Sequence, residues 1–154
     1  MGTNFPRTTA QIGGHPIHPM LVGFPIVLFI ATLVCDIVFW RNASDPVYQI
    51  TCWALGIGLA FAALAAVAGV IEFIGDKRIA RLADAWWHAG TNVIVVVIEA
   101  VNLYMRLKDG STFVTSGGLA LSAVAVLLLV FSGWKGGSLV FRYRVGVRHD
   151  DEPI

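Results

Sequence analysis

Three histidines of this chain stand where imidazole groups can bind a metal ion or a haem iron. His15 and His18 precede the first long apolar stretch, and His88 lies near the beginning of the third. Pro16 and Pro19 follow the first two directly, and a residue before proline is biased away from the helical conformation. The motif therefore predicts two imidazoles held in place at the start of the stretch and outside its helix.

A haem b is the cofactor that this histidine set favours. Histidine is the usual axial ligand of haem iron, and the core of a helix bundle is a common cofactor site. We expect His18 and His88 to bind it, with His15 as the competing ligand. No haem-attachment motif is present, so the haem would not be covalent. Apolar walls and cations for the propionates are available in Phe24, Phe73, Trp86 and Trp87 and in Arg7, Lys77, Arg78 and Arg81.

Two other interpretations of the same residues stay open. Imidazole and carboxylate groups also suit Zn, Fe or Cu, so His15, His18, His88 and Glu72 can form a non-haem metal site. Alternatively, His15 and His18 only anchor the first helix at the membrane surface. The chain is then a structural or assembly protein without a cofactor.

The elements that must position these residues are four long apolar stretches, at about 20–40, 47–74, 85–105 and 114–134. A helix needs about 20 apolar residues to cross the hydrocarbon core of a bilayer. A spanning segment must pair its own backbone polar groups, so these stretches are expected to be helices. His18–Pro19 and Asp45–Pro46 have the form of an N-cap followed by proline at the first helical position.

Composition excludes most other classes of protein. Of the 154 residues, 56% are hydrophobic and 14% are charged, against about 45–50% and 25% in soluble domains. The net charge of +1 gives no reason to expect nucleic acid as a partner. No nucleophile elbow, phosphate-binding loop or dinucleotide fingerprint is present. A small integral membrane protein remains, and a stand-alone enzyme is not favoured.

The expected fold is all-α: one domain over residues 1–154, an up-down-up-down four-helix bundle in which short connections make neighbouring helices antiparallel. In the tail, 135–154, apolar and basic residues alternate over 139–147. This predicts a short strand or an extended interfacial segment. Small residues recur at helical spacing in the second span and allow close helix packing or a homo-oligomer.

Lysine and arginine predict the orientation, because cytoplasmic loops carry an excess of both. One side has three: Arg41, Arg106 and Lys108. The side that contains both tails has eight: Arg7, Lys77, Arg78, Arg81, Lys135, Arg142, Arg144 and Arg148. Both termini are therefore expected in the cytoplasm.

Ionisable groups inside a membrane are costly and mark candidate functional sites. At about 100° per residue, the polar residues of the third span fall within about 80° of one another and should face the bundle interior. In the first span, Asp36 should also point inward, paired with Arg41 or Arg106. Cys35 and Cys52 lie at matching depth, where two free thiols are favoured over a disulfide. The polar stripe comprises Asp84, His88, Asn92, Glu99 and Asn102.

Several of these motifs resemble those of an uncharacterised bacterial family of four-helix membrane proteins, domain of unknown function family 2231. The resemblance covers nearly the whole chain. It rests on Gly14-His15-Pro16-Ile17-His18-Pro19, Phe24-Pro25, Asp36, Gly69-x-x-Glu72, His88 and Gly136-Gly137-x-Leu139-Val140-Phe141.

The resemblance implies a multi-pass protein of the bacterial inner (cytoplasmic) membrane. Family members occur fused to, or beside, redox modules, which favours an electron-transfer subunit with a quinone or a redox protein as its partner. The chain departs from the family near its end, where Tyr143-Arg144 replaces His-Gly. This departure leaves His15, His18 and His88 as the candidate ligands.

Overall fold

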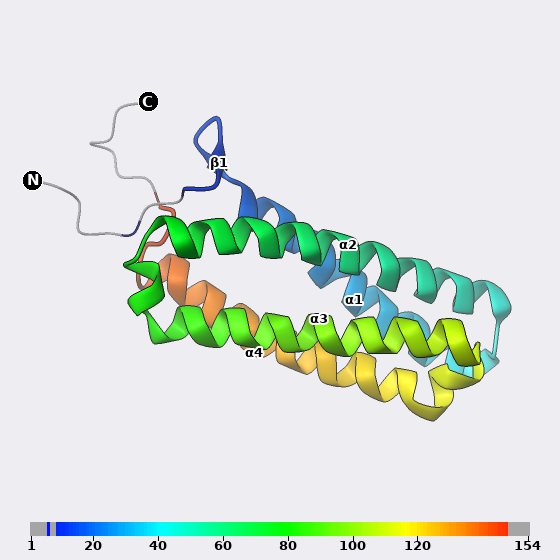
Figure 1. Ribbon diagram of the computed structural model, residues 1–154. Helices are drawn as coiled ribbons and strands as arrows, with labels where there is room; N and C mark the ends of the chain where they lie inside the picture. The colour runs from blue at the N-terminus through cyan, green and yellow to red at the C-terminus, as the bar shows by residue number, and fades with distance from the viewer. Residues whose placement is uncertain (1–5, 7–8, 148–154) are drawn as a thin grey trace, which may run out of the picture.

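The computed structural model describes Pro6 and residues 9–147, and these form a bundle of four long helices (Figure 1). Each helix runs antiparallel to the one before it, as the short connections predict. The four helices are long and apolar enough to cross a membrane, which confirms the all-α membrane bundle. They are α1 (Ile17–Asn42), α2 (Asp45–Gly75), α3 (Ala83–Asp109) and α4 (Leu119–Phe141).

Shorter elements connect or precede the helices. A single 3-10 turn, η1 (Ile79–Arg81), joins α2 to α3, and a π-helical turn, η2 (Val114–Gly118), leads into α4. Before α1, the strands β1 (Gln11–Ile12) and β2 (His15–Pro16) pair in a small antiparallel hairpin. Gly13 and Gly14 form its turn with positive φ angles, which glycine adopts without steric cost. This hairpin was not predicted from the sequence.

The start of α1 corrects one expectation. The helix begins at Ile17, so His18 and Pro19 both lie inside its first turn. A backbone N–H in the first turn has no partner within the helix, so proline removes no hydrogen bond there. His15 alone of the two histidines remains outside the helix, in β2.

The predicted extended tail is wrong. Helix α4 continues to Phe141, and the chain then turns, with Arg142 and Tyr143 both bonding to the carbonyl oxygen of Ser138. The backbone of this segment is therefore satisfied locally, and no neighbouring strand lies there for it to pair with among the residues described. The turn continues to Val147. Arg7 and residues 148–154, which include Arg148, lie outside the described residues.

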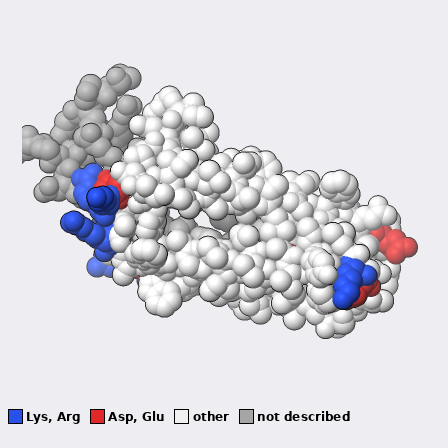
Figure 2. Space-filling view, in the orientation of Figure 1, with Lys and Arg blue, Asp and Glu red and all other residues white. Residues whose placement is uncertain are grey.

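Both described ends of the chain lie at the end of the bundle that carries the α2–α3 connection (Figure 1). The amide of Gly146 donates to the carbonyl oxygen of Pro6 at 3.4 Å, and the Thr9 hydroxyl donates to that of Ile71 at 3.1 Å. On the face shown in Figure 2, charged side chains gather at the two ends and leave the long middle uncharged. A bilayer requires this distribution of charge.

The apolar core sits at mid-length and takes residues from all four helices. It contains Phe29 of α1, Leu55 and Ala62 of α2, Val95 of α3 and Ala125 of α4, all buried. The ring of Phe29 packs against Gly58, where an added Cβ would lie 2.7 Å from the ring. Small residues on α2 therefore allow α1 and α2 to approach closely, as expected where lipid removes the hydrophobic drive between helices.

We expect Gly58→Ala to lower the free energy of unfolding by about 1–3 kcal/mol, because the new methyl group overpacks a buried ring that has nowhere to move. Denaturation in mixed micelles measures this. Gly23→Ala in α1 is the matched control, since nothing lies within 4 Å of its added Cβ. A loss in the control equal to that at Gly58 would contradict the close-packing explanation.

Candidate functional site

His18 is held by the helix beside its own. It lies in the first turn of α1, and its Nδ1 donates to the carbonyl oxygen of Ala65 on α2 at 2.8 Å. The ring packs over Gly69, where an added Cβ would lie 3.2 Å from its atoms. The bond to Ala65 and the contact with Gly69 fix the orientation of the imidazole.

Helices α1 and α2 form one helical hairpin, and α3 and α4 form the other. His88 is held by the second helical hairpin in the same way as His18 is by the first. It lies in the second turn of α3, and its Nδ1 donates to the carbonyl oxygen of Ser132 on α4 at 2.9 Å. The amide of Asn92 lies 3.2 Å from Nε2. A Cβ added at Gly136 would lie 2.9 Å from the ring. Each histidine therefore donates to a carbonyl oxygen of the next helix and packs over a glycine of that helix, His18 between α1 and α2 and His88 between α3 and α4.

These two residues, the His pair, face each other between the two hairpins. Their ring centroids are 6.1 Å apart, and the ring planes are nearly perpendicular at 86°. A carbonyl oxygen only accepts, so each Nδ1 carries the proton and each Nε2 keeps its lone pair. Metal-binding histidines usually show this pattern, because the bond from the other nitrogen fixes the tautomer and orients the ring.

Two imidazoles on facing helices are a donor set that a haem iron could use. Both rings are half-buried, and Figure 2 shows the surface hollowed between α2 and α3. His18 and His88 would hold such a haem between the α1–α2 and α3–α4 pairs of helices.

The four residues of the alternative metal site do not come together. His15 is exposed on the hairpin, where its Nδ1 bonds to the carbonyl oxygen of Gly13 at 3.1 Å. Glu72 is buried in the last turn of α2, with no partner for its Oε1. Within residues 9–147 and Pro6, no three His, Cys, Asp or Glu side chains form a group that could hold a metal ion. The structure favours the His pair over the larger set.

The aromatic residues and the arginine that were expected to contact a haem lie at the outer surface of the bundle. Phe24 is half exposed and stacks on Phe61 of α2 at 4.4 Å. Trp87 is exposed and meets Phe131 of α4 edge-on at 6.3 Å. Arg81 is exposed in η1. These positions suit contact with lipid or with the rim of a cofactor rather than with its centre.

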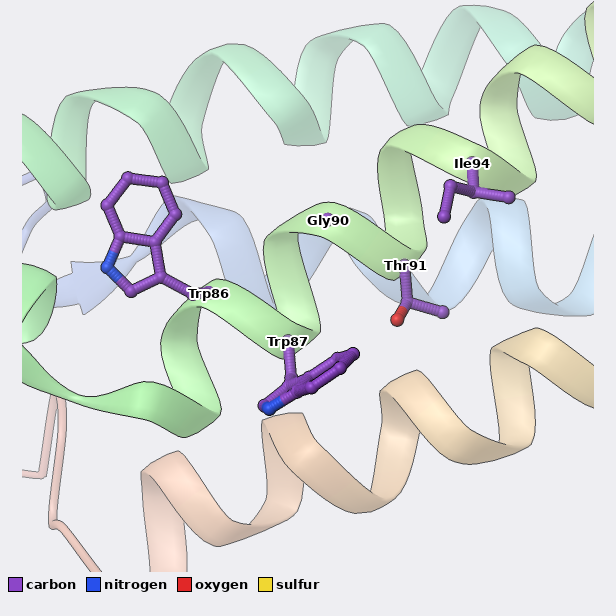
Figure 3. Close-up of a pocket in the computed structure, with 5 residues that line it drawn as sticks. All are labelled: Trp86, Trp87, Gly90, Thr91 and Ile94. Atoms are coloured by element: carbon purple, nitrogen blue, oxygen red, sulfur yellow. The ribbon is translucent and has the colours of Figure 1, made fainter.

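A separate hollow of about 330 Å³ lies on α3, lined by Trp86, Trp87, Gly90, Thr91 and Ile94. Figure 3 shows Trp86 directed toward α2 and Trp87 toward α4. Neither member of the His pair lines this hollow.

Toward the opposite end of the bundle, all four helices meet in a second polar group. We call it the ion-pair cluster: Asp36 of α1, Thr51 of α2, Glu99, Asn102 and Arg106 of α3, and Ser122 of α4. Every member is fully buried. Arg106 binds Asp36 through both terminal nitrogens, at 2.7 and 2.6 Å. Thr51 and Ser122 donate to the same carboxylate at 2.9 and 2.7 Å.

The polar stripe predicted on α3 separates into three groups. Asp84 pairs with Lys135 of α4 at 2.9 Å near the tails. Asn92 joins His88, as described above. Glu99 and Asn102 belong to the ion-pair cluster, where Asn102 Nδ2 donates to Glu99 Oε2 at 2.9 Å. The predicted inward direction holds, and Arg106 rather than Arg41 is the partner of Asp36.

Sequence reasoning missed the small hydroxyl residues that complete both groups. Ser122 and Ser132 sit in a span without charge, and Thr51 sits in one rich in small apolar residues. The hydroxyl groups of Thr51 and Ser122 donate to Asp36, and that of Ser132 lies beside His88. A hydroxyl inside an apolar span is a usable signal, since a buried polar atom requires a partner. Cys35 and Cys52 are free thiols.

One comparison with known proteins finds a match. A family model described as "Predicted membrane protein (DUF2231)" matches residues 14–149. This range contains the His pair and the whole ion-pair cluster. No curated protein and no solved structure matches the chain.

Proposed function

The chain belongs to the DUF2231 family of predicted membrane proteins, whose model covers most of its length, and we propose that it is a haem b subunit of membrane electron transfer. His18 and His88 would hold the iron, one from each hairpin. The observation that carries the proposal is the pair of imidazoles 6.1 Å apart, each with Nδ1 bonded to a carbonyl oxygen of a neighbouring helix.

The way in which the rings are supported favours a ligand role over simple helix cross-linking. A cross-link needs one bond between two helices, and each histidine makes it with Nδ1 alone. Nε2 of His18 then keeps its lone pair, and Nε2 of His88 lies 3.2 Å from the amide of Asn92. Gly69 and Gly136 leave room for both rings. Two rings with matching support, one on each side of a seam, suit a ligand shared between the hairpins.

Bound haem supplies one-electron redox chemistry, and the protein controls its setting. The Nδ1–H bonds to Ala65 and Ser132 raise the basicity of both ligands. Asn92 lies beside Nε2 of His88, and its amide would have to move aside for that nitrogen to bind iron. The surrounding apolar helices limit access of water to the site.

We place this end of the bundle at the cytoplasmic face of a bacterial inner membrane. Eight Lys and Arg residues accompany it in the sequence, against three at the other end, and cytoplasmic loops carry this excess. Exposed Lys and Arg at the rim offer contacts for a redox protein, and the membrane offers a quinone. A homo-oligomer stays a prediction.

An optical spectrum tests the proposal. Protein purified from haem-replete cells should show a Soret band and, after dithionite reduction, an α band. His18→Ala and His88→Ala should each abolish that spectrum, because each removes one of the two imidazoles that would hold the iron. His15→Ala is the matched control and should keep the spectrum, since His15 is exposed and bonds only within its hairpin.

A colourless wild-type protein from such cells would contradict haem binding. Elemental analysis of that preparation then separates the remaining alternatives. A stoichiometric transition metal would point to a non-haem centre at the His pair. Its absence would leave a structural or assembly protein, in which His18→Ala and His88→Ala lower stability alone.

A further inference from the structure

Glu99 is the one member of the ion-pair cluster whose charge has no contacting counter-charge. It lies inside α3, about 24 Å along the axis from the helix start and about 15 Å from its end. Its side chain is fully buried. Oε2 accepts from Asn102 at 2.9 Å, and Oε1 has no partner. The carboxyl group is therefore far from water at either surface and receives a single hydrogen bond.

Arg106 makes no hydrogen bond to Glu99, because its donors are used elsewhere. Guanidinium has five N–H groups. Nε donates to Asn102, Nη1 to Asp36 and Thr51, and Nη2 to Asp36 and Ser122. The two-point contact with Asp36 leaves the cation neutralised.

The charge balance of the cluster follows from these contacts. Asp36 and Arg106 are the charged groups that act on Glu99, and they cancel each other. The neighbours from α2 and α4, Thr51 and Ser122, carry no charge. An ionised Glu99 would make the buried cluster negative, and an uncompensated charge in an apolar interior costs several kcal/mol. A bound proton removes this cost.

We propose that Glu99 is a proton-binding site in the membrane interior whose occupancy is set by the Asp36–Arg106 ion pair. While Asp36 neutralises Arg106, Glu99 keeps its proton. When Asp36 no longer does so, Arg106 becomes the counter-ion of Glu99. The O–H bond of the carboxyl group then breaks, the electron pair stays on oxygen, and the proton leaves the cluster for bulk water outside the bundle. The site is independent of haem binding at the His pair.

Infrared spectroscopy tests the site directly, because a protonated carboxyl group and a carboxylate have separate C–O stretching bands. Wild type at pH 7 should show a protonated-carboxyl band that Glu99→Gln lacks. The glutamine variant is the matched change, since its amide oxygen can still accept from Asn102. An unchanged protonated-carboxyl band in Glu99→Gln would overturn the proposal, since it means that Glu99 is ionised in wild type.

Asp36→Asn tests the coupling to the ion pair. The asparagine leaves Arg106 without its counter-ion, so the band assigned to Glu99 should be lost and a carboxylate band should appear. Persistence of the protonated band in this folded variant would overturn the coupling. If Asp36→Asn does not fold, the wild-type minus Glu99→Gln difference spectrum is titrated from pH 5 to pH 9. The band should persist at neutral pH, and its absence there refutes the site.

Discussion

Asp36→Ala should lower the free energy of unfolding by about 3–5 kcal/mol, the largest stability effect expected in this protein. The variant leaves Arg106 as a buried cation without its carboxylate, and breaking a buried pair from one side costs about this much. Thr51 and Ser122 also lose the oxygen atoms to which they donate. Denaturation in mixed micelles, followed by circular dichroism, measures the loss.

A partly exposed ion pair provides the control. Asp84 and Lys135 lie 2.9 Å apart near the tails, and Asp84→Ala should cost about 1 kcal/mol or less, because solvent screens such a pair. The double variant Asp36→Leu/Arg106→Met should recover much of the stability lost in Asp36→Ala, since it removes both charges together. Equal losses in Asp36→Ala and Asp84→Ala would show that burial does not set the strength of this pair.

Gly136→Ala should weaken haem binding by about 10–100-fold, the size of effect typical when the support of a metal-binding side chain is lost. The added methyl group would lie 2.9 Å from the ring of His88, which must then move away from α4. The Nδ1 bond to Ser132 breaks, and the ring leaves its position opposite His18. Haem titration of the purified apoprotein, read from the Soret band, measures the change.

Gly133→Ala, one turn earlier on α4, is the matched control, because nothing lies within 4 Å of its added Cβ. It should bind haem as wild type does. Should Gly136→Ala and wild type bind haem with equal affinity, His88 is not a ligand. This experiment depends on the proposed haem site, whereas the effects of Asp36→Ala and Glu99→Gln do not.

The two polar groups have different physical roles in the same bundle. The ion-pair cluster bonds to all four helices and is fully buried, so its first effect is to specify how the helices pack. The His pair joins α1 to α2 and α3 to α4, because Nδ1 of each ring donates to a carbonyl oxygen of the next helix. The first group serves packing, whereas the second also carries the nitrogen atoms that the proposed haem would use.

Much of this protein was predictable from the order of its residues. Four apolar stretches of spanning length require four helices, because lipid leaves backbone polar groups no other partner. The short connections make those helices antiparallel. The 3.6-residue period of α3 places Glu99 and Asn102 on the inward face, and the structure confirms this. These are local or one-dimensional properties, so the sequence determines them without knowledge of packing.

Contacts between helices were decided only by the tertiary structure. Whether Arg41 or Arg106 binds Asp36 depends on the rotation of α3 against α1, which a helical period does not specify. The orientation of the His pair depends on the backbone carbonyl oxygens of Ala65 and Ser132. Every residue type has such an oxygen, so the sequence gives no sign of which residues accept these bonds. The alternation at 139–147 predicted a strand, yet α4 continues to Phe141 and the chain then turns, because a strand needs a neighbour whereas a helix or turn bonds locally.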